Sequence, residues 1–402
     1  MKAVRVIIIG GGAAGFFTAI NIADKHPDWQ ITILEKTNKL LSKVKISGGG
    51  RCNVTNGRTT PSELVPFYPR GGKKLYSLFQ EFGTKDMRKW LEKRGVKTNE
   101  EADHRVFPTT NNSQTIIDCF QNEVRKHNIR VQMNFGVQNI SLEENKWRIS
   151  SGSGEIFADK IIIATGSSPA SWKTLQQIGL EIVKPVPSLF TFNIKDERIQ
   201  DLMGIAFGNV LVKIVGSKLE ESGPLLITHW GFSGPAILKL SAWGARDLAE
   251  KNYHFQILIN YTGNCSADQV RSNLNSIKSD FPKRKLSNHP MYDIPKRFWE
   301  RLLECCEITS DIPAGELSKK QLNKLVEELT QGLYSVNGKS TFKEEFVTSG
   351  GVKLSEIDLK TFEAKRFPNL YLAGEVLDID ALTGGFNFQA CWSAGWVIAQ
   401  NI

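Results

Sequence analysis

The order of apolar and polar positions predicts a strand, a tight turn, a helix and a second strand at the start of the chain. An apolar run from Val4 to Ile9 predicts a buried strand, and the stretch that ends at Asp24 has the pattern of a helix packed on it. A shorter apolar run over 30–34 predicts a neighbouring strand. Strands that alternate with helices are typical of a parallel sheet, so the chain is predicted to be an α/β protein with a Rossmann-like domain.

Glycines at the turn indicate what this unit binds. Gly10, Gly12 and Gly15 have GxGxxG spacing, and Glu35 follows the second strand, 20 residues after Gly15. In such a unit the first glycine allows the tight turn, the second lets the backbone approach a pyrophosphate, and the third lets helix and strand pack closely. The pyrophosphate meets the N-terminus of the helix, and the acid accepts hydrogen bonds from ribose hydroxyls. The unit therefore predicts a dinucleotide site.

Two later segments extend this domain. Residues 159–168 (DKIIIATGSS) have the pattern of a strand that ends in Ala-Thr-Gly, and residues 369–400 predict a strand, an acidic loop, a glycine turn and a last helix. Both patterns are typical of two-part, glutathione-reductase-like flavoprotein folds. We therefore expect one nucleotide-binding domain made of residues 1–188 and 343–402.

The segment between these two parts is expected to be an insertion. Short β-type runs separated by Gly, Asn and Ser predict a small β-rich, barrel-like subdomain over 189–264. Longer charged segments with helical periodicity predict a small helical subdomain over 265–342. A length of 402 residues is consistent with two or three folding units.

Bulk composition indicates a soluble protein. Hydrophobic residues make up 41% and charged residues 23%, and no apolar stretch approaches the roughly 20 residues that cross a bilayer. The first strand begins so near the N-terminus that we expect no signal peptide. Six cysteines without CxxC spacing favour reduced thiols, a cytoplasmic location and no bound metal.

Positive charge is concentrated in one part of the chain. The net charge is +9, and residues 36–97 contain 15 Lys or Arg against four acids. Such a segment beside a dinucleotide site would attract phosphates or an anionic substrate. A solvated face without a partner is the alternative interpretation.

The segment ISGGGRCNVTN at 46–56 carries a resemblance to a known family. Together with GGGAAG, GPLLITHWGFSGPAIL, TSGGV and LYLAGEVLDIDALTGGFNFQ, it resembles the BaiN-like (YhiN-like) flavoproteins, also described as aminoacetone-oxidase-family FAD-binding proteins. The resemblance covers essentially the whole chain. It departs at the loop after 164–166, where relatives have a glycine-rich run and this chain has SSPASWKTLQQ.

The resemblance implies that FAD is the cofactor and names the residues that contact it. Segment 10–15 would line the pyrophosphate, Glu35 with Lys36 the ribose, segment 43–53 the diphosphate, ribityl chain and flavin ring, and segment 375–387 the ribityl chain and the N1–C2=O edge. The implied set is Gly10, Gly12, Ala13, Ala14, Gly15, Glu35, Lys36, Lys43, Ser47, Gly48, Gly49, Arg51, Asn53, Val137, Ala164, Thr165, Gly166, Gly374, Glu375, Asp378, Gly385, Phe386 and Asn387.

Catalytic residues are less well defined by the sequence. His229 could donate to a substrate carbonyl or act as a base, Arg105 could face the mouth of the site, and Asn387 lies at the expected start of the last helix. For each of these a structural role is an alternative: a junction histidine, a surface ion pair and a helix cap. Cys52 has no second cysteine at redox spacing, which favours a packing thiol over a disulfide mechanism.

By resemblance, the chain is expected to be an FAD-dependent oxidoreductase. The preferred reaction passes hydride from NADH or NADPH to an activated C=C bond of a hydrophobic or anionic small molecule. No second GxGxxG follows a strand, so a nicotinamide donor would bind only transiently. Oxidation of a small amine is one alternative, and an FAD-containing RNA-binding or RNA-modifying protein is another, although no RNA-binding module is recognisable and nucleic acid is not the expected partner.

Overall fold

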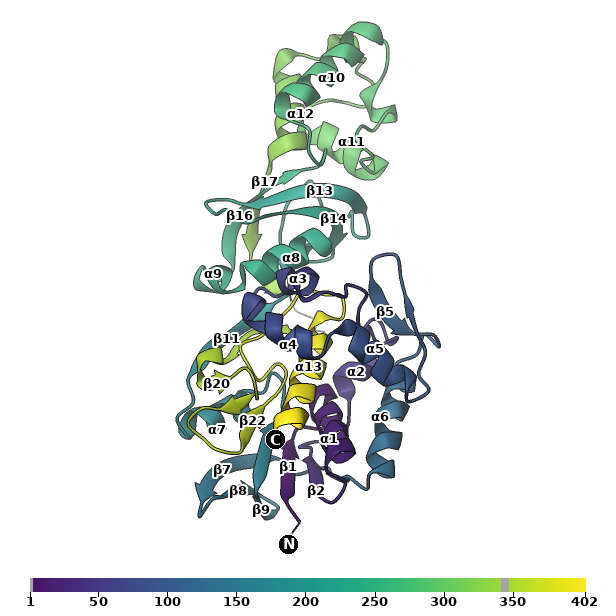
Figure 1. Cartoon of the computed structure of the whole chain (residues 1–402). Coiled ribbons are helices and arrows are strands. Elements are labelled where there is room, and N and C mark those ends of the chain that lie inside the picture. Colours follow the sequence, from purple (N-terminus) through teal and green to yellow (C-terminus); the bar gives the residue numbers. More distant parts are fainter. Residues whose placement is uncertain (1–2, 341–346) are drawn as a thin grey trace. The chain divides into compact units, whose positions relative to one another are not determined.

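The computed structural model describes residues 3–340 and 347–402, which form two compact units (Figure 1). The first unit combines Met1–Val186 with Val347–Ile402, and the second is Pro187–Phe346. Each unit has its own buried apolar core. The predicted boundaries at 188 and 343 lie a few residues from these, and residues 341–346 lie outside the described part of the chain.

A seven-stranded sheet forms the centre of the first unit, in the order β20-β21-β22-β10-β1-β2-β6. Its strands are β1 (Arg5–Ile9), β2 (Gln30–Leu34), β6 (Arg130–Gln132), β10 (Lys160–Ile163), β20 (Ile357–Asp358), β21 (Glu363–Ala364) and β22 (Leu370–Leu372). The strands from β22 to β6 are parallel, and Ile9 pairs with both Ile163 and Leu34. Because parallel strands end at the same edge, the loops after β22, β10, β1 and β2 gather there. The predicted Rossmann-like α/β fold is confirmed.

Helices cover this sheet, and the first and last of them pack together. The helices of the unit are α1 (Ala13–Lys25), α2 (Ser42–Ile46), α3 (Pro61–Leu64), α4 (Tyr76–Glu81), α5 (Thr84–Glu92), α6 (Gln114–Lys126), α7 (Pro169–Gln177) and α13 (Phe386–Asn401). Helix α1 contacts α13, where the ring of Phe17 lies 5.2 Å from that of Trp392 and 4.9 Å from that of Trp90. Aromatic burial at this junction joins the two ends of the chain.

Three small sheets complete the first unit. Their strands are β3 (Thr55–Asn56), β4 (Thr98–Glu100) and β5 (Arg105–Pro108); β7 (Val137–Glu143), β8 (Lys146–Ser151) and β9 (Gly154–Ala158); and β11 (Ile182–Ser188) with β19 (Val347–Val352). The β11–β19 pair is where the chain leaves the first unit and returns to it. A Cβ on Gly350 would lie 2.7 Å from Cα of Pro185, so the two strands approach closely there.

The second unit is an antiparallel sheet with helices, in the strand order β17-β16-β13-β14-β15-β12-β18. Its strands are β12 (Thr191–Asn193), β13 (Ala206–Ile214), β14 (Glu220–Thr228), β15 (Gly231–Ser233), β16 (His254–Asn260), β17 (Gly332–Asn337) and β18 (Lys339–Ser340). Its helices are α8 (Pro235–Trp243), α9 (Ala245–Glu250), α10 (Ala267–Asp280), α11 (Lys296–Cys305) and α12 (Lys319–Gln331).

Three elements of the insertion differ from the predicted division into a β-rich part (189–264) and a helical part (265–342). Strand β17 lies in the range expected to be helical, because buried and exposed residues alternate along it and it pairs with β16. Helices α8 and α9 lie in the range expected to be β-rich. No helix in the described ranges is long and apolar enough to cross a membrane.

Candidate flavin site

The glycine turn has the geometry that its three positions were expected to provide. Gly10 has φ +119°, and a Cβ there would lie 2.3 Å from the carbonyl oxygen of Ala164. A Cβ on Gly15 would lie 2.0 Å from the carbonyl oxygen of Gly10, so only glycine lets α1 pack this closely on β1. A Cβ on Gly12, by contrast, would meet no atom within 4 Å. Open space therefore lies beside Gly12, at the N-terminus of α1 where Ala13 and Ala14 begin the helix.

Glu35 connects the end of β2 to this turn. One carboxylate oxygen accepts from the N–H of Gly11 at 2.9 Å, and the other accepts from the N–H and hydroxyl of Thr37. The N–H of Phe135 donates to the carbonyl oxygen of Glu35 at 2.9 Å, so the chain that leads into Val137 runs beside the exposed Lys36. The structure thus brings Glu35 and Lys36 beside Phe135 and Gly136, the residues that precede Val137.

The loop after β10 contributes a buried hydroxyl without a partner. Ala164 donates its N–H to Ile9, which places Thr165 and Gly166 beside the glycine turn. The hydroxyl of Thr165 is buried and has no hydrogen-bond partner in the described structure. A buried polar atom of this kind costs about 1–3 kcal/mol unless a ligand satisfies it. Thr165 and the space beside Gly12 therefore fit a bound dinucleotide.

An ion pair joins α2 to the loop after β22. Lys43 bonds to the carboxylate of Glu375, which also accepts from the hydroxyl of Ser167 at 3.4 Å. A Cβ on Gly374 would lie 3.3 Å from that of Ala14, so this loop reaches the start of α1. Asp378 follows in the same loop and is tied to β19 through its N–H. Sequence reasoning had proposed Lys43 and Glu375 separately, and the structure pairs them.

The signature segment 46–56 begins with a run of left-handed glycines. Gly48 and Gly49 have φ values of +58° and +67°, a conformation that favours glycine. A Cβ on Gly49 would meet nothing within 4 Å. The hydroxyl of Ser47 donates to Val44, and the carboxamide oxygen of Asn53 accepts from the N–H of Val106. The loop is thus anchored on both sides while its glycine tip stays open.

The far end of the signature lies against the start of α13. A Cβ on Gly385 would lie 2.3 Å from the carbonyl oxygen of Thr55, and the hydroxyl of Thr55 donates to Gln389 at 2.6 Å. Trp392 donates to the carbonyl oxygen of Val54 at 2.8 Å. Two segments more than 300 residues apart in the sequence therefore pack directly against each other. The buried Phe386 lies at this contact, at the start of α13.

The weak catalytic candidates of the first unit have structural partners. The amide of Asn387 donates to and accepts from the backbone of Ala381 at 3.0 and 2.9 Å, which closes the loop before α13. Arg105 pairs with Glu101 and Asp103. Arg51 pairs with the same Glu101 at 2.7 Å, beside the ring of Phe107. Arg105 therefore forms the surface ion pairs of its structural alternative, and Arg51 is held in an ion pair as well. Asn387 is not a helix cap, because its side chain bonds to the preceding loop and Gly385 stands at the N-cap of α13.

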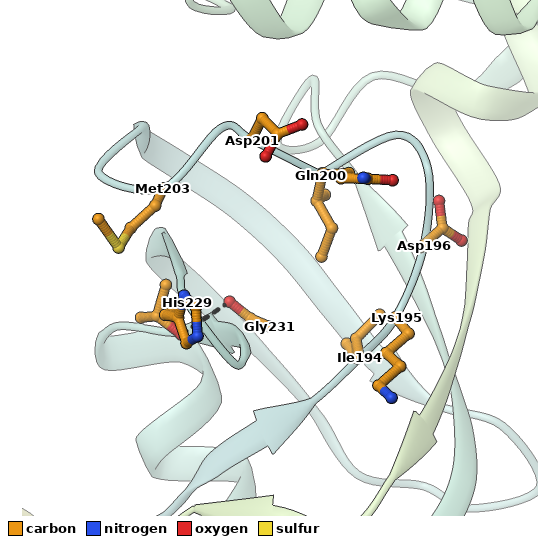
Figure 2. A pocket seen from close by; sticks show the side chains of 10 residues that line it. Ile194, Lys195, Asp196, Gln200, Asp201, Met203, His229 and Gly231 are labelled. Atoms are coloured by element: carbon orange, nitrogen blue, oxygen red, sulfur yellow. Dashed lines mark hydrogen bonds between the residues drawn. The ribbon is translucent and has the colours of Figure 1, made fainter.

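His229 belongs to the second unit, where it lines a pocket of about 600 Å³ (Figure 2). It is exposed at the turn between β14 and β15, beside Trp230, whose side chain is 54% exposed. The pocket is lined by Ile194, Lys195, Asp196, Ile199, Gln200, Asp201, Met203, Thr228, His229 and Gly231. The structure therefore places His229 in a pocket of its own unit, and its catalytic role stays a prediction.

Sequence reasoning missed a buried ion pair in the first unit. Asp380 is fully buried and bonds through both carboxylate oxygens to the guanidinium of Arg70. The two residues are 310 positions apart, so no local pattern could have connected them. The pair anchors the segment after α3 to the loop that carries Glu375 and Asp378.

One cluster in the described part of the chain has the composition of a metal site. Asp24, Glu123 and His127 lie close together, with 3.0 Å between Nε2 of His127 and Oδ1 of Asp24. The guanidinium of Arg94 contacts both carboxylates, at 2.6 and 3.2 Å. The positive charge of Arg94 therefore balances these two carboxylates. The expectation that no metal is bound stays a prediction.

Two thiols with raised pKa values give a testable property of the site. Burial raises the pKa of Cys52 to about 12, and burial together with the carboxylate of Glu375 raises that of Cys391 to about 12. At pH 8 only about one such thiol in 10⁴ is ionised. We expect iodoacetamide to leave Cys52 unmodified in the folded protein and to modify it after unfolding, as measured by peptide mass spectrometry. The partly exposed Cys265 is the internal control, and labelling of Cys52 as fast as Cys265 would contradict the expectation.

A family model described as the HI0933-like protein Rossmann domain matches residues 4–401. The chain belongs to this family. The resemblance to BaiN-like flavoproteins is thereby confirmed. The matched range covers both units, so the family model includes the second unit as well as the first.

Curated relatives align along their whole length. The chain is 28% identical to "Ribosomal RNA dihydrouridine synthase" of Escherichia coli over 100% of this chain and 98% of the relative. It is 25% identical to "3-dehydro-bile acid delta(4,6)-reductase" of Clostridium scindens over 98% of each. A Haemophilus influenzae protein with the same name as the first is 27% identical over 98% of each chain. The expectation that nucleic acid is not a partner is therefore not confirmed.

Two solved structures share this fold. A flavocytochrome c3 fumarate reductase in an open conformation has a TM-score of 0.50 at 13% identity, covering 100% of this chain and 78% of its own. A 3-ketosteroid-Δ4-(5α)-dehydrogenase from Rhodococcus jostii has a TM-score of 0.50 at 12% identity, covering 98% and 97%. As a member of this family, the chain is an FAD-dependent oxidoreductase.

Proposed function

We propose that the chain reduces a C=C bond conjugated to a carbonyl. The names of three relatives describe this type of bond: C5=C6 of uracil is conjugated to a ring carbonyl, and the 4,6-diene of a 3-dehydro bile acid to its 3-keto group. Reduced FAD supplies a hydride for such a reaction. This common chemistry across full-length relatives is the observation that carries the proposal.

The first unit supplies binding and electrostatics for this reaction. The N–H groups at the start of α1 and the space beside Gly12 suit the pyrophosphate, and the unpartnered hydroxyl of Thr165 suits a polar atom of the adenosine half. The N-terminus of α13, at Gly385 and Phe386, would face the N1–C2=O edge of the flavin. Its partial positive charge favours the negative charge of the reduced ring. The proposal also includes the other FAD contacts that were expected from the sequence.

The substrate that we favour is a uracil in RNA. Many lysines of segment 36–97 are exposed. Within ranges 3–340 and 347–402, the cations of this segment that pair with acids outside it are Lys43, Arg51, Arg70, Arg88 and Arg94. The uncompensated charge favours a polyanion and disfavours a cationic amine, which is the substrate of the oxidase alternative. A steroid-like dienone is the second candidate, because the Clostridium scindens relative acts on one.

Anaerobic turnover separates these possibilities. The FAD-loaded protein is reduced anaerobically with NADH or NADPH and then mixed with a ribosomal RNA transcript or a 3-keto-4,6-diene steroid. In a separate reaction, the oxidised protein is mixed with aminoacetone in air. We expect one nicotinamide to bleach the flavin spectrum and the RNA to restore it while one uridine gains two hydrogen atoms, as measured by mass spectrometry. Reoxidation by the steroid alone would favour the second candidate. Failure of both nicotinamides together with aerobic turnover of aminoacetone would overturn the reductase proposal.

A further inference from the structure

A basic loop in the second unit is not used by the flavin site. It joins α10 to a short 3-10 turn, Leu286–Asn288, and contains three consecutive cations, Lys283, Arg284 and Lys285. Lys283 and Lys285 are exposed. Neither Lys283 nor Arg284 forms an ion pair with any acid in ranges 3–340 and 347–402, in contrast to the paired cations of the first unit. Lys283 and Arg284 therefore present uncompensated positive charge, whereas Lys285 lies close enough to Asp311 to contribute to the lowered pKa of that carboxyl.

An aromatic ring and a hollow accompany this charge. Phe281 is 49% exposed, and the guanidinium of Arg284 lies 4.0 Å from the centroid of its ring. The loop borders a hollow of about 490 Å³, lined by Asp280, Phe281, Pro282, Lys283, Arg284 and His289. Asp280 is the one acid among these lining residues. An exposed ring beside unpaired cations is the combination with which proteins hold a base and its phosphates.

The loop is held in one conformation by backbone hydrogen bonds. The N–H groups of Ala314 and Gly315 donate to the carbonyl oxygens of Arg284 and Pro282 at 2.7 and 2.8 Å. The N–H of Arg284 itself donates to Phe281 at 2.9 Å. A preformed loop loses little conformational entropy when it binds, which favours a recognition role over a merely solvated charge run.

We propose that this loop, Phe281 to His289, is a docking site for single-stranded RNA. Lys283, Arg284 and Lys285 contact phosphates, and an unstacked base lies on the ring of Phe281 in the adjoining hollow. The inference rests on the proposed RNA substrate and adds a contact surface outside the flavin site. It assigns the second unit a part in substrate recognition.

The test measures RNA binding by the FAD-loaded protein without turnover. Fluorescence anisotropy follows a fluorescein-labelled single-stranded RNA at increasing KCl concentrations, for the unchanged protein and for the triple variant Lys283→Gln, Arg284→Gln, Lys285→Gln. We expect binding about tenfold or more weaker at low salt, and a slope of log K against log[KCl] that is shallower by about 2, since each phosphate contact contributes roughly 0.7. Phe281→Ala is expected to weaken binding about tenfold without a change in slope, because stacking is not ionic.

A matched variant removes the same charge elsewhere in the unit. Lys218→Gln, Lys251→Gln, Lys319→Gln changes three exposed lysines and is expected to bind RNA within about twofold of the unchanged protein, since surface charges away from the contact add little. Equal affinities of the two triple variants would overturn the docking site, and the proposed function would stand if RNA were still reduced. Absence of RNA binding by the unchanged protein at low salt would overturn both the docking site and the RNA substrate. Flavin absorption and near-UV circular dichroism check that each variant is folded.

Discussion

Gly12→Val is expected to leave the protein folded and to weaken FAD binding at least about a hundredfold. A Cβ at this position meets no protein atom within 4 Å and the backbone φ is −96°, so the fold accommodates a side chain. The added atoms occupy the space through which a pyrophosphate would approach the N–H groups of α1. FAD titration followed by fluorescence quenching measures the affinity, and urea denaturation measures the stability of the apoprotein.

Gly10→Ala is the contrasting variant. Its Cβ would lie 2.3 Å from the carbonyl oxygen of Ala164 at a φ of +119°, so β1, β10 and the turn must shift. We expect a loss of several kcal/mol in the free energy of unfolding, about 2–4, even before FAD is added. If Gly12→Val instead unfolded the apoprotein while Gly10→Ala left it stable, the assignment of the two glycines would be wrong.

Asp380→Asn is expected to destabilise the first unit by about 3–5 kcal/mol. The change removes the carboxylate charge that pairs with the largely buried Arg70, and breaking a buried ion pair from one side is strongly destabilising. Urea denaturation of the apoprotein, followed by tryptophan fluorescence, measures the effect. Since the same loop carries Glu375 and Asp378, FAD affinity should fall as well.

The double variant Arg70→Met, Asp380→Leu separates charge from packing. Replacing both members with apolar residues removes both buried charges, and such replacements are often neutral or stabilising. We expect it to recover at least half of the stability that Asp380→Asn loses. A double variant as unstable as the single one would mean that the pair acts through shape rather than through its charges.

Local patterns were enough to predict the parts of the site that follow strands. Gly10, Glu35, Thr165 and Glu375 each stand directly after an apolar run, and parallel strands bring such positions to one edge. The same reasoning found the Rossmann-like domain in two pieces, because both pieces carry strand and helix periodicity. Their contacts with FAD remain predictions.

The ion pairs and the strand that could not be predicted depend on contacts between residues far apart in the sequence. Nothing near Arg70 indicates Asp380, and nothing near Arg51 shows that Glu101 takes up its charge. Strand β17 was missed because its six residues follow directly on α12 and depend on β16 for their hydrogen bonds. Strand propensity is weak compared with such tertiary pairing.

The β11–β19 pair has a consequence for how this architecture can vary. Because the two strands are hydrogen-bonded to each other, the points at which the second unit leaves and re-enters lie side by side on the first unit. Insertions at such adjoining points disturb a host domain little. Changes within the second unit can therefore accumulate during evolution without rebuilding the sheet of the first unit.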